Sequence, residues 1–123
     1  MRLLAMLLSF SMGSLMAQNP QTPGDWRAWL NRGVEAFKNA RYSEAAADFQ
    51  KAVDLNPTDA SARLYLGTAY MQQYIPGADS PENLAMAERA NAAFNSVLTI
   101  DSNNRVALAS LASVAPSAPT ARR

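Results

Sequence analysis

Apolar and small residues recur along this chain at intervals that place them on one side of a helix. Ala45, Phe49, Ala52 and Leu55 follow one another at intervals of four, three and three residues. Such spacing is typical of an amphipathic helix, because residues three and four apart lie on the same face. It predicts a helix over residues 43–54.

The same arrangement occurs a second time. The set is repeated 45 residues later as Ala90, Phe94, Val97 and Ile100. Upstream of each set lies another apolar segment containing one glycine, Gly33 in the first and Gly67 in the second. Glycine inside a helix costs up to about 1 kcal/mol relative to alanine, so we expect the backbone of a neighbouring helix to approach closely at both glycines.

These patterns predict an all-α protein, a short α-solenoid of antiparallel helix pairs. The second unit carries an insertion after Tyr70, with a Pro-Gly turn signal at Pro76 and Gly77. Ser80 followed by Pro81 is a typical helix start. The expected helices are 25–38, 43–54, 59–73, 81–99 and 104–113. The last helix lacks a partner, so it is either a terminal capping helix or the start of a truncated third unit, which we favour slightly.

The N-terminus has the layout of a secretory signal. Arg2 is followed by an apolar run over residues 3–10 and then by small residues up to Ala17. We therefore expect residues 1–17 to be a signal peptide and the protein to be exported, periplasmic or secreted. The alternative is a chain anchored in the membrane by an uncleaved N-terminus. Residues 18–24 would be a linker, residues 25–113 the repeat domain and residues 114–123 a disordered tail.

The spacing resembles the tetratricopeptide repeat family, whose pattern is W-x2-L-G-x2-Y, then A-x3-F, then P. The matching residues are Trp29, Gly33, Ala45, Phe49 and Pro57 in the first unit and Gly67, Tyr70, Ala90 and Phe94 in the second. Departures include Arg32 in place of leucine, Arg63 in place of tryptophan, Ala36 in place of tyrosine and Ser102 in place of proline. The resemblance covers about residues 26–112 and implies two degenerate repeats plus part of a third.

In this family the first helix of each pair lines a concave groove that binds peptides or proteins. Carried over to this chain, the resemblance implies the partner-binding residues Arg27, Leu30, Asn31, Val34, Lys38, Ser61, Leu64, Tyr65, Thr68 and Gln72. Packing in the core is the competing interpretation for the apolar members. Some members clamp a C-terminal carboxylate with lysine and asparagine on the first inner helix. Leu30 and Val34 occupy those places here, which disfavours that activity.

Composition removes most other classes of function. The chain has no cysteine and no histidine, so thiolate chemistry, imidazole bases and thiolate or imidazole metal ligands are missing. Eleven basic and ten acidic side chains give a net charge of +1, unlike a nucleic-acid binder. Glu44 and Asp48 form one close acidic pair, which we interpret as a helix-start residue and an exposed-face residue. We expect no catalysis, cofactor, metal, nucleic acid or small-molecule substrate.

The expected function is therefore an exported module that binds a peptide or protein partner in its concave groove. The alternative is a structural element, or a fragment of a longer array, that associates with a second copy through its open repeat end. Measuring the size of the particle in solution would separate the two.

Overall fold

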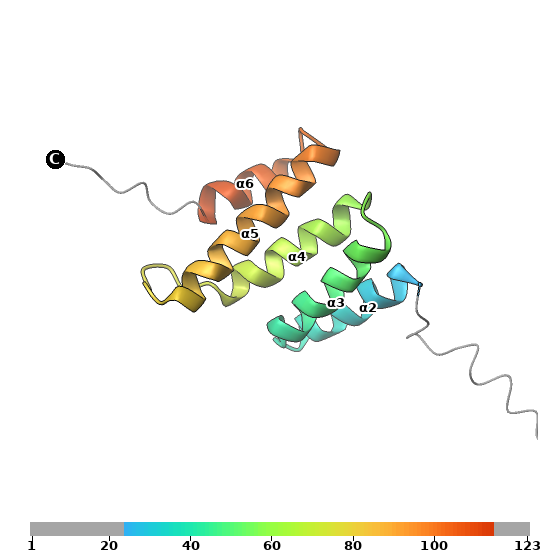
Figure 1. The fold of residues 1–123 in the computed structure, drawn as a ribbon, viewed down its shortest axis with the longest axis horizontal. Coiled ribbons are helices and arrows are strands. Elements are labelled where there is room, and N and C mark those ends of the chain that lie inside the picture. The colour runs from blue at the N-terminus through green and yellow to red at the C-terminus, as the bar shows by residue number, and fades with distance from the viewer. Residues whose placement is uncertain (1–23, 115–123) are drawn as a thin grey trace, which may run out of the picture.

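The computed structural model describes residues 24–114, which form five helices joined by short loops. They are α2 (Trp26–Lys38), α3 (Tyr42–Leu55), α4 (Ala60–Gln73), α5 (Pro81–Ile100) and α6 (Arg105–Val114). The helices follow one another across the stack from α2 at one end to α6 at the other (Figure 1). The all-α solenoid is confirmed, and the predicted bounds differ from the observed ones by one residue or so.

Each helix packs against the next, and α6 also touches α4. The core consists of two clusters. The first joins α2 and α3 to the near sides of α4 and α5, and the second joins α4, α5 and α6. Phe49 lies in the first cluster and Phe94 in the second, and both are fully buried. The two aromatic residues thus hold equivalent places, as their spacing predicts.

The two helical glycines mark close contacts with these rings. A Cβ atom on Gly33 would lie 2.6 Å from Phe49 Cδ1, and one on Gly67 would lie 2.7 Å from Phe94 Cε1. We expected a helix backbone to approach each glycine, and this detail is wrong. The second helix of each pair instead places carbons of its aromatic ring against the glycine of the first helix. The glycines are needed because a methyl group would occupy the ring's place.

Side-chain caps fix where most helices begin. The carboxylate of Asp25 accepts a hydrogen bond from the Arg27 N–H at the start of α2, and Asp59 accepts one from Ala62 N–H at the start of α4. Ser80 accepts one from Asn83 N–H, with Pro81 at the first position of α5 as predicted. Such caps satisfy N–H groups that have no partner inside the helix.

The insertion in the second unit forms an ordered loop between α4 and α5. Asn83, which is buried, accepts a hydrogen bond from Ile75 N–H at 2.6 Å. Its amide nitrogen donates to Ile75 C=O at 2.7 Å and to Ala78 C=O at 2.8 Å. One side chain thus ties the loop to the first turn of α5. This role of Asn83 could not be predicted from sequence spacing, because its partners are backbone groups of an irregular segment.

Several expectations fall on residues that the structure does not describe. The signal peptide at 1–17, the linker apart from Gly24, and the tail apart from Val114 lie outside the described residues. Val114 itself is buried and belongs to α6 rather than to a tail. Within residues 24–114, no helix is both long and apolar enough to span a membrane.

Candidate binding groove

The first helices of the successive units, α2, α4 and α6, line a common hollow of about 380 Å³. We call it the inner groove. Its walls are Val34, Phe37 and Lys38 from α2, Phe49 from α3, Leu64, Tyr65 and Thr68 from α4, and Val106 from α6. Pockets of this size, lined by apolar side chains with a few polar groups, are typical of binding sites.

Aromatic rings give the inner groove a firm wall. The Tyr65 ring stacks on Phe49 with 5.4 Å between ring centroids and an interplanar angle of 21°. Phe37 meets Tyr42 edge to face at 5.1 Å. Rings held in this way lose little conformational freedom when a ligand binds, so the wall is already formed in the free protein.

Polar groups are few along these walls. The Thr68 hydroxyl donates to Leu64 C=O at 2.8 Å, so its hydrogen is already used. Lys38 is exposed and takes part in neither of the ion pairs found within residues 24–114. The groove is therefore an apolar hollow with one ammonium group available at its edge.

Half of the predicted binding residues line this groove, namely Val34, Lys38, Leu64, Tyr65 and Thr68. The other five do not. Arg27 and Asn31 line a separate polar hollow, and Leu30 is half-buried against the first core cluster. Ser61 and Gln72 are exposed on α4 outside the groove lining.

Sequence reasoning missed three groove residues, Phe37, Phe49 and Val106. Phe49 is fully buried and contributes to the groove from behind the Tyr65 ring that stacks on it. Val106 is 56% exposed and occupies the position in the third unit that Ser61 occupies in the second. Extending the 45-residue spacing from Ser61 to Val106 would have found it.

An ion pair that we did not expect joins α2 to α3 outside the groove lining. Asp48 was predicted on an exposed face, but only 4% of it is exposed, so this prediction is wrong. Its Oδ2 lies 3.2 Å from Arg32 Nε, without hydrogen-bond geometry. Burial raises the pKa of Asp48 above its ordinary value of 3.8, and the Arg32 charge acts in the opposite direction.

This pair explains why arginine stands at position 32, where the family has leucine. The equivalent positions in the second unit are Leu66 and Ala93, which are buried against the first unit. Nothing in the described chain covers the corresponding surface of the first unit, so polar residues are tolerated there. The stack thus has an ionic face at its α2–α3 end.

Replacing Arg32 with leucine should lower the free energy of unfolding at neutral pH by about 1–2 kcal/mol. The change leaves the Asp48 carboxylate buried without a cation, and the effect is limited because the Arg32 side chain is 40% exposed. An acid whose pKa is raised on folding binds its proton more tightly in the folded state, so its ionisation costs stability as pH rises above 3.8.

The loss caused by Arg32→Leu should therefore shrink as pH falls towards 3.8, because the raised pKa lets Asp48 take up its proton above that value in the folded protein. Urea titrations of the parent and the variant at neutral and acidic pH measure this difference in the free energy of unfolding. The double variant Arg32→Leu with Asp48→Ala copies the second unit and should recover most of the loss. An equal loss at both pH values would contradict the role of Asp48.

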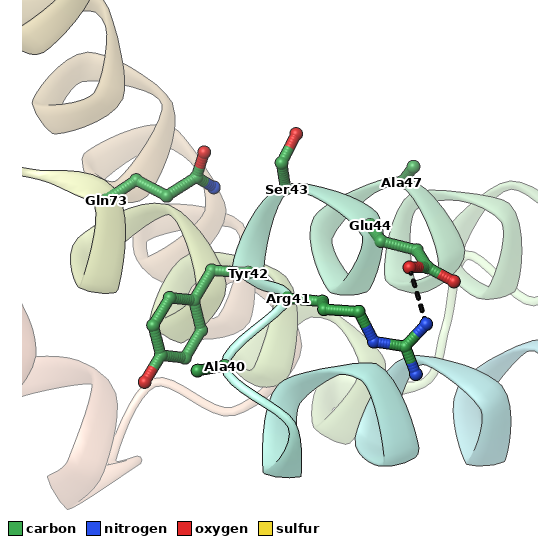
Figure 2. Close-up of a pocket in the computed structure, with 7 residues that line it drawn as sticks. All are labelled: Ala40, Arg41, Tyr42, Ser43, Glu44, Ala47 and Gln73. Atoms are coloured by element: carbon green, nitrogen blue, oxygen red, sulfur yellow. Dashed lines mark hydrogen bonds and ion pairs between the residues drawn. The ribbon is translucent and has the colours of Figure 1, made fainter.

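Another hollow, of about 690 Å³, lies at the α2–α3 turn (Figure 2). There the Arg41 guanidinium pairs with Glu44 at 2.9 Å, as the dashed line shows. The remaining lining side chains are short, apart from Tyr42 and Gln73. Because its charges are already paired and it offers little apolar surface, this hollow is a weaker candidate. Residues 24–114 also contain no cluster of acidic side chains suited to a metal ion.

The stacked helix pairs and the shared groove define a helical-repeat protein of the class that mediates protein–protein interactions. Residues 26–59, which comprise α2, α3 and the loop after them, match the family model of the tetratricopeptide repeat. Residues 26–59 therefore form a tetratricopeptide repeat. A comparison with curated proteins gave no match.

Proposed function

We propose that the protein binds a segment of another polypeptide in the inner groove, without catalysing a reaction on it. The observation that carries the proposal is the preformed apolar hollow between α2, α4 and α6, which no side chain of residues 24–114 fills. Large apolar side chains inserted into such pockets supply most of the energy in protein interfaces. The family match supports a role in protein interaction in general.

Val106→Asp is the sharpest test of this proposal. Val106 is 56% exposed and lines the groove, so a carboxylate there should disrupt binding of an apolar segment with little effect on folding. We expect capture of the partner to fall at least about tenfold, while the helical circular-dichroism signal stays unchanged. Leu64→Asp is a poorer test, because Leu64 also packs against the second core cluster.

Ile75→Asp is the matched control. Ile75 is also apolar and 64% exposed, but it lies in the α4–α5 loop outside the inner groove. Proteins captured by the parent chain and by Ile75→Asp, but lost with Val106→Asp, would be groove ligands. If Val106→Asp captures the same proteins at the same level as the parent, the groove is not the binding site.

We further propose that the protein is exported. The support is the order of Arg2, the apolar run over residues 3–10 and Ala17 in the sequence. The intact mass of the protein isolated from the cell envelope tests this directly. A mass that still includes residues 1–17 would favour the anchored alternative.

A second candidate function is self-association through α6. The unit that α6 begins has no second helix within the described chain, and Leu108 of α6 is 49% exposed. Ala112 next to it, also exposed, occupies the place that Gly33 and Gly67 hold in the other units. The opposite end of the stack carries the Arg32–Asp48 pair, so head-to-tail stacking would bury charges.

Two copies would therefore meet α6 to α6 and form a closed dimer rather than a filament. Sedimentation equilibrium over a range of concentrations distinguishes the two candidates. A monomer at all concentrations removes self-association, and a dimer that Leu108→Asp converts to monomer supports it.

A further inference from the structure

We infer that the segment held in the inner groove combines a bulky apolar side chain with a neighbouring acidic residue. The inference rests on the proposed groove-binding function and adds the chemistry of the partner. It comes from the single charged side chain of the groove lining, which is a lysine.

The groove lining contains one charged side chain, Lys38, and no carboxylate. Of the two ion pairs found within residues 24–114, one joins Arg32 to Asp48 and the other joins Arg41 to Glu44. Both lie on the α2–α3 side, away from the groove lining. Lys38 is therefore a cation whose charge is not balanced by the chain described here.

Arg27 and Asn31 share their separate hollow with the carboxylates of Asp25, Glu35 and Glu44, but the helix positions that continue the groove carry no negative charge themselves. On α2, the intervals of four, three and four residues between Arg27, Asn31, Val34 and Lys38 place them on one face. The equivalent positions on α4 are Ser61, Leu64, Tyr65, Thr68 and Gln72, and those on α6 are Val106, Ala109, Ser110 and Ser113. None of these residues is acidic, although acidic residues make up ten of the chain's 123.

This combination determines the preferred partner. The aromatic and aliphatic walls select a large apolar side chain, and Lys38 at the edge attracts a carboxylate a short distance away along the partner segment. An ion pair beside an apolar wall is less screened by water than one on an open surface. A basic partner segment would instead place a second positive charge against Lys38.

Short labelled peptides test this directly. Each would carry a central phenylalanine or leucine flanked by glutamate, and matched peptides would carry lysine in place of glutamate. Fluorescence anisotropy with the full chain should show that the glutamate peptide binds about tenfold more tightly, and that the difference shrinks at high salt. Equal affinity, or tighter binding of the lysine peptide, would overturn the inference.

Charge reversal at Lys38 is the decisive step. Lys38→Glu should reverse the order, so that the lysine peptide binds more tightly than the glutamate peptide. Lys51→Glu is the matched control, because Lys51 is exposed on α3 outside the groove and the change in net charge is the same. If both variants shift binding equally, the effect comes from net charge and the inference falls.

The same assay separates failure of the inference from failure of the groove proposal. Val106→Asp should weaken binding of both peptides. If it does so while the parent chain shows no preference for glutamate, only the inference about charge is wrong. If Val106→Asp leaves binding unchanged, or if the parent binds neither peptide, groove binding itself is contradicted.

Discussion

Replacing Phe49 or Phe94 with alanine should lower the free energy of unfolding by about 3–5 kcal/mol, the usual cost of removing a fully buried aromatic ring. Neither ring is exposed to solvent, and each fills the space between the two helices of its own unit. Small domains are stable by only about 5–15 kcal/mol, so either change should bring the protein close to unfolding.

Thermal and urea denaturation followed by circular dichroism measure this loss. Leu55→Ala is a suitable control, because Leu55 lies on the same helix as Phe49 but is 43% exposed, and its truncation should cost much less. If both phenylalanine variants unfold at the same temperature as the parent, the alignment of the two units is wrong.

Gly67→Ala should destabilise the protein by about 1–3 kcal/mol, although alanine is the better helix former. The added methyl group would lie 2.7 Å from Phe94 Cε1 and 2.9 Å from Cδ1, and a ring buried on all sides cannot move away easily. Gly33→Ala should behave in the same way, because its Cβ would lie 2.6 Å from two Phe49 ring carbons.

The sign of this effect should reverse once the ring is removed. In a chain that already carries Phe94→Ala, Gly67→Ala meets no ring and should increase stability by up to about 1 kcal/mol. A double-mutant cycle measured by urea denaturation provides the comparison. If Gly67→Ala has the same effect in both backgrounds, the glycine is not held in place by the Phe94 ring.

The parts of the fold that depend on local spacing could be predicted from the sequence. Helix positions, the start of α5 at Pro81 and the paired roles of Phe49 and Phe94 all follow from periodicity, caps and repetition, which are properties of neighbouring residues. The tetratricopeptide assignment followed from the same spacing and is confirmed over residues 26–59.

Features that depend on distant contacts were harder to predict. The burial of Asp48 requires Arg32 on another helix, and the role of Asn83 requires an irregular loop to fold over it. Five of the groove residues could be predicted from the sequence, because those on α2 and α4 recur at helical spacing on one face of each helix. Val106 was missed because the third unit was judged incomplete. Leu30 was wrongly assigned to the groove, because facing the groove and facing the core look alike in sequence.

The two ends of the stack differ, with an ion pair at the α2–α3 end and an exposed leucine on α6, and this difference matters for extending the array by design. A helix pair fused before α2 would have to cover the Arg32–Asp48 pair, and it would bury charges unless both residues were changed together. A helix fused after α6 would instead meet Leu108 and Ala112, an apolar side chain beside a small one, which is the surface that second helices prefer. Designed extensions of this array should therefore be added at α6, with Ala112 changed to glycine where the first new helix places a large aromatic residue opposite it, as at Gly33 and Gly67.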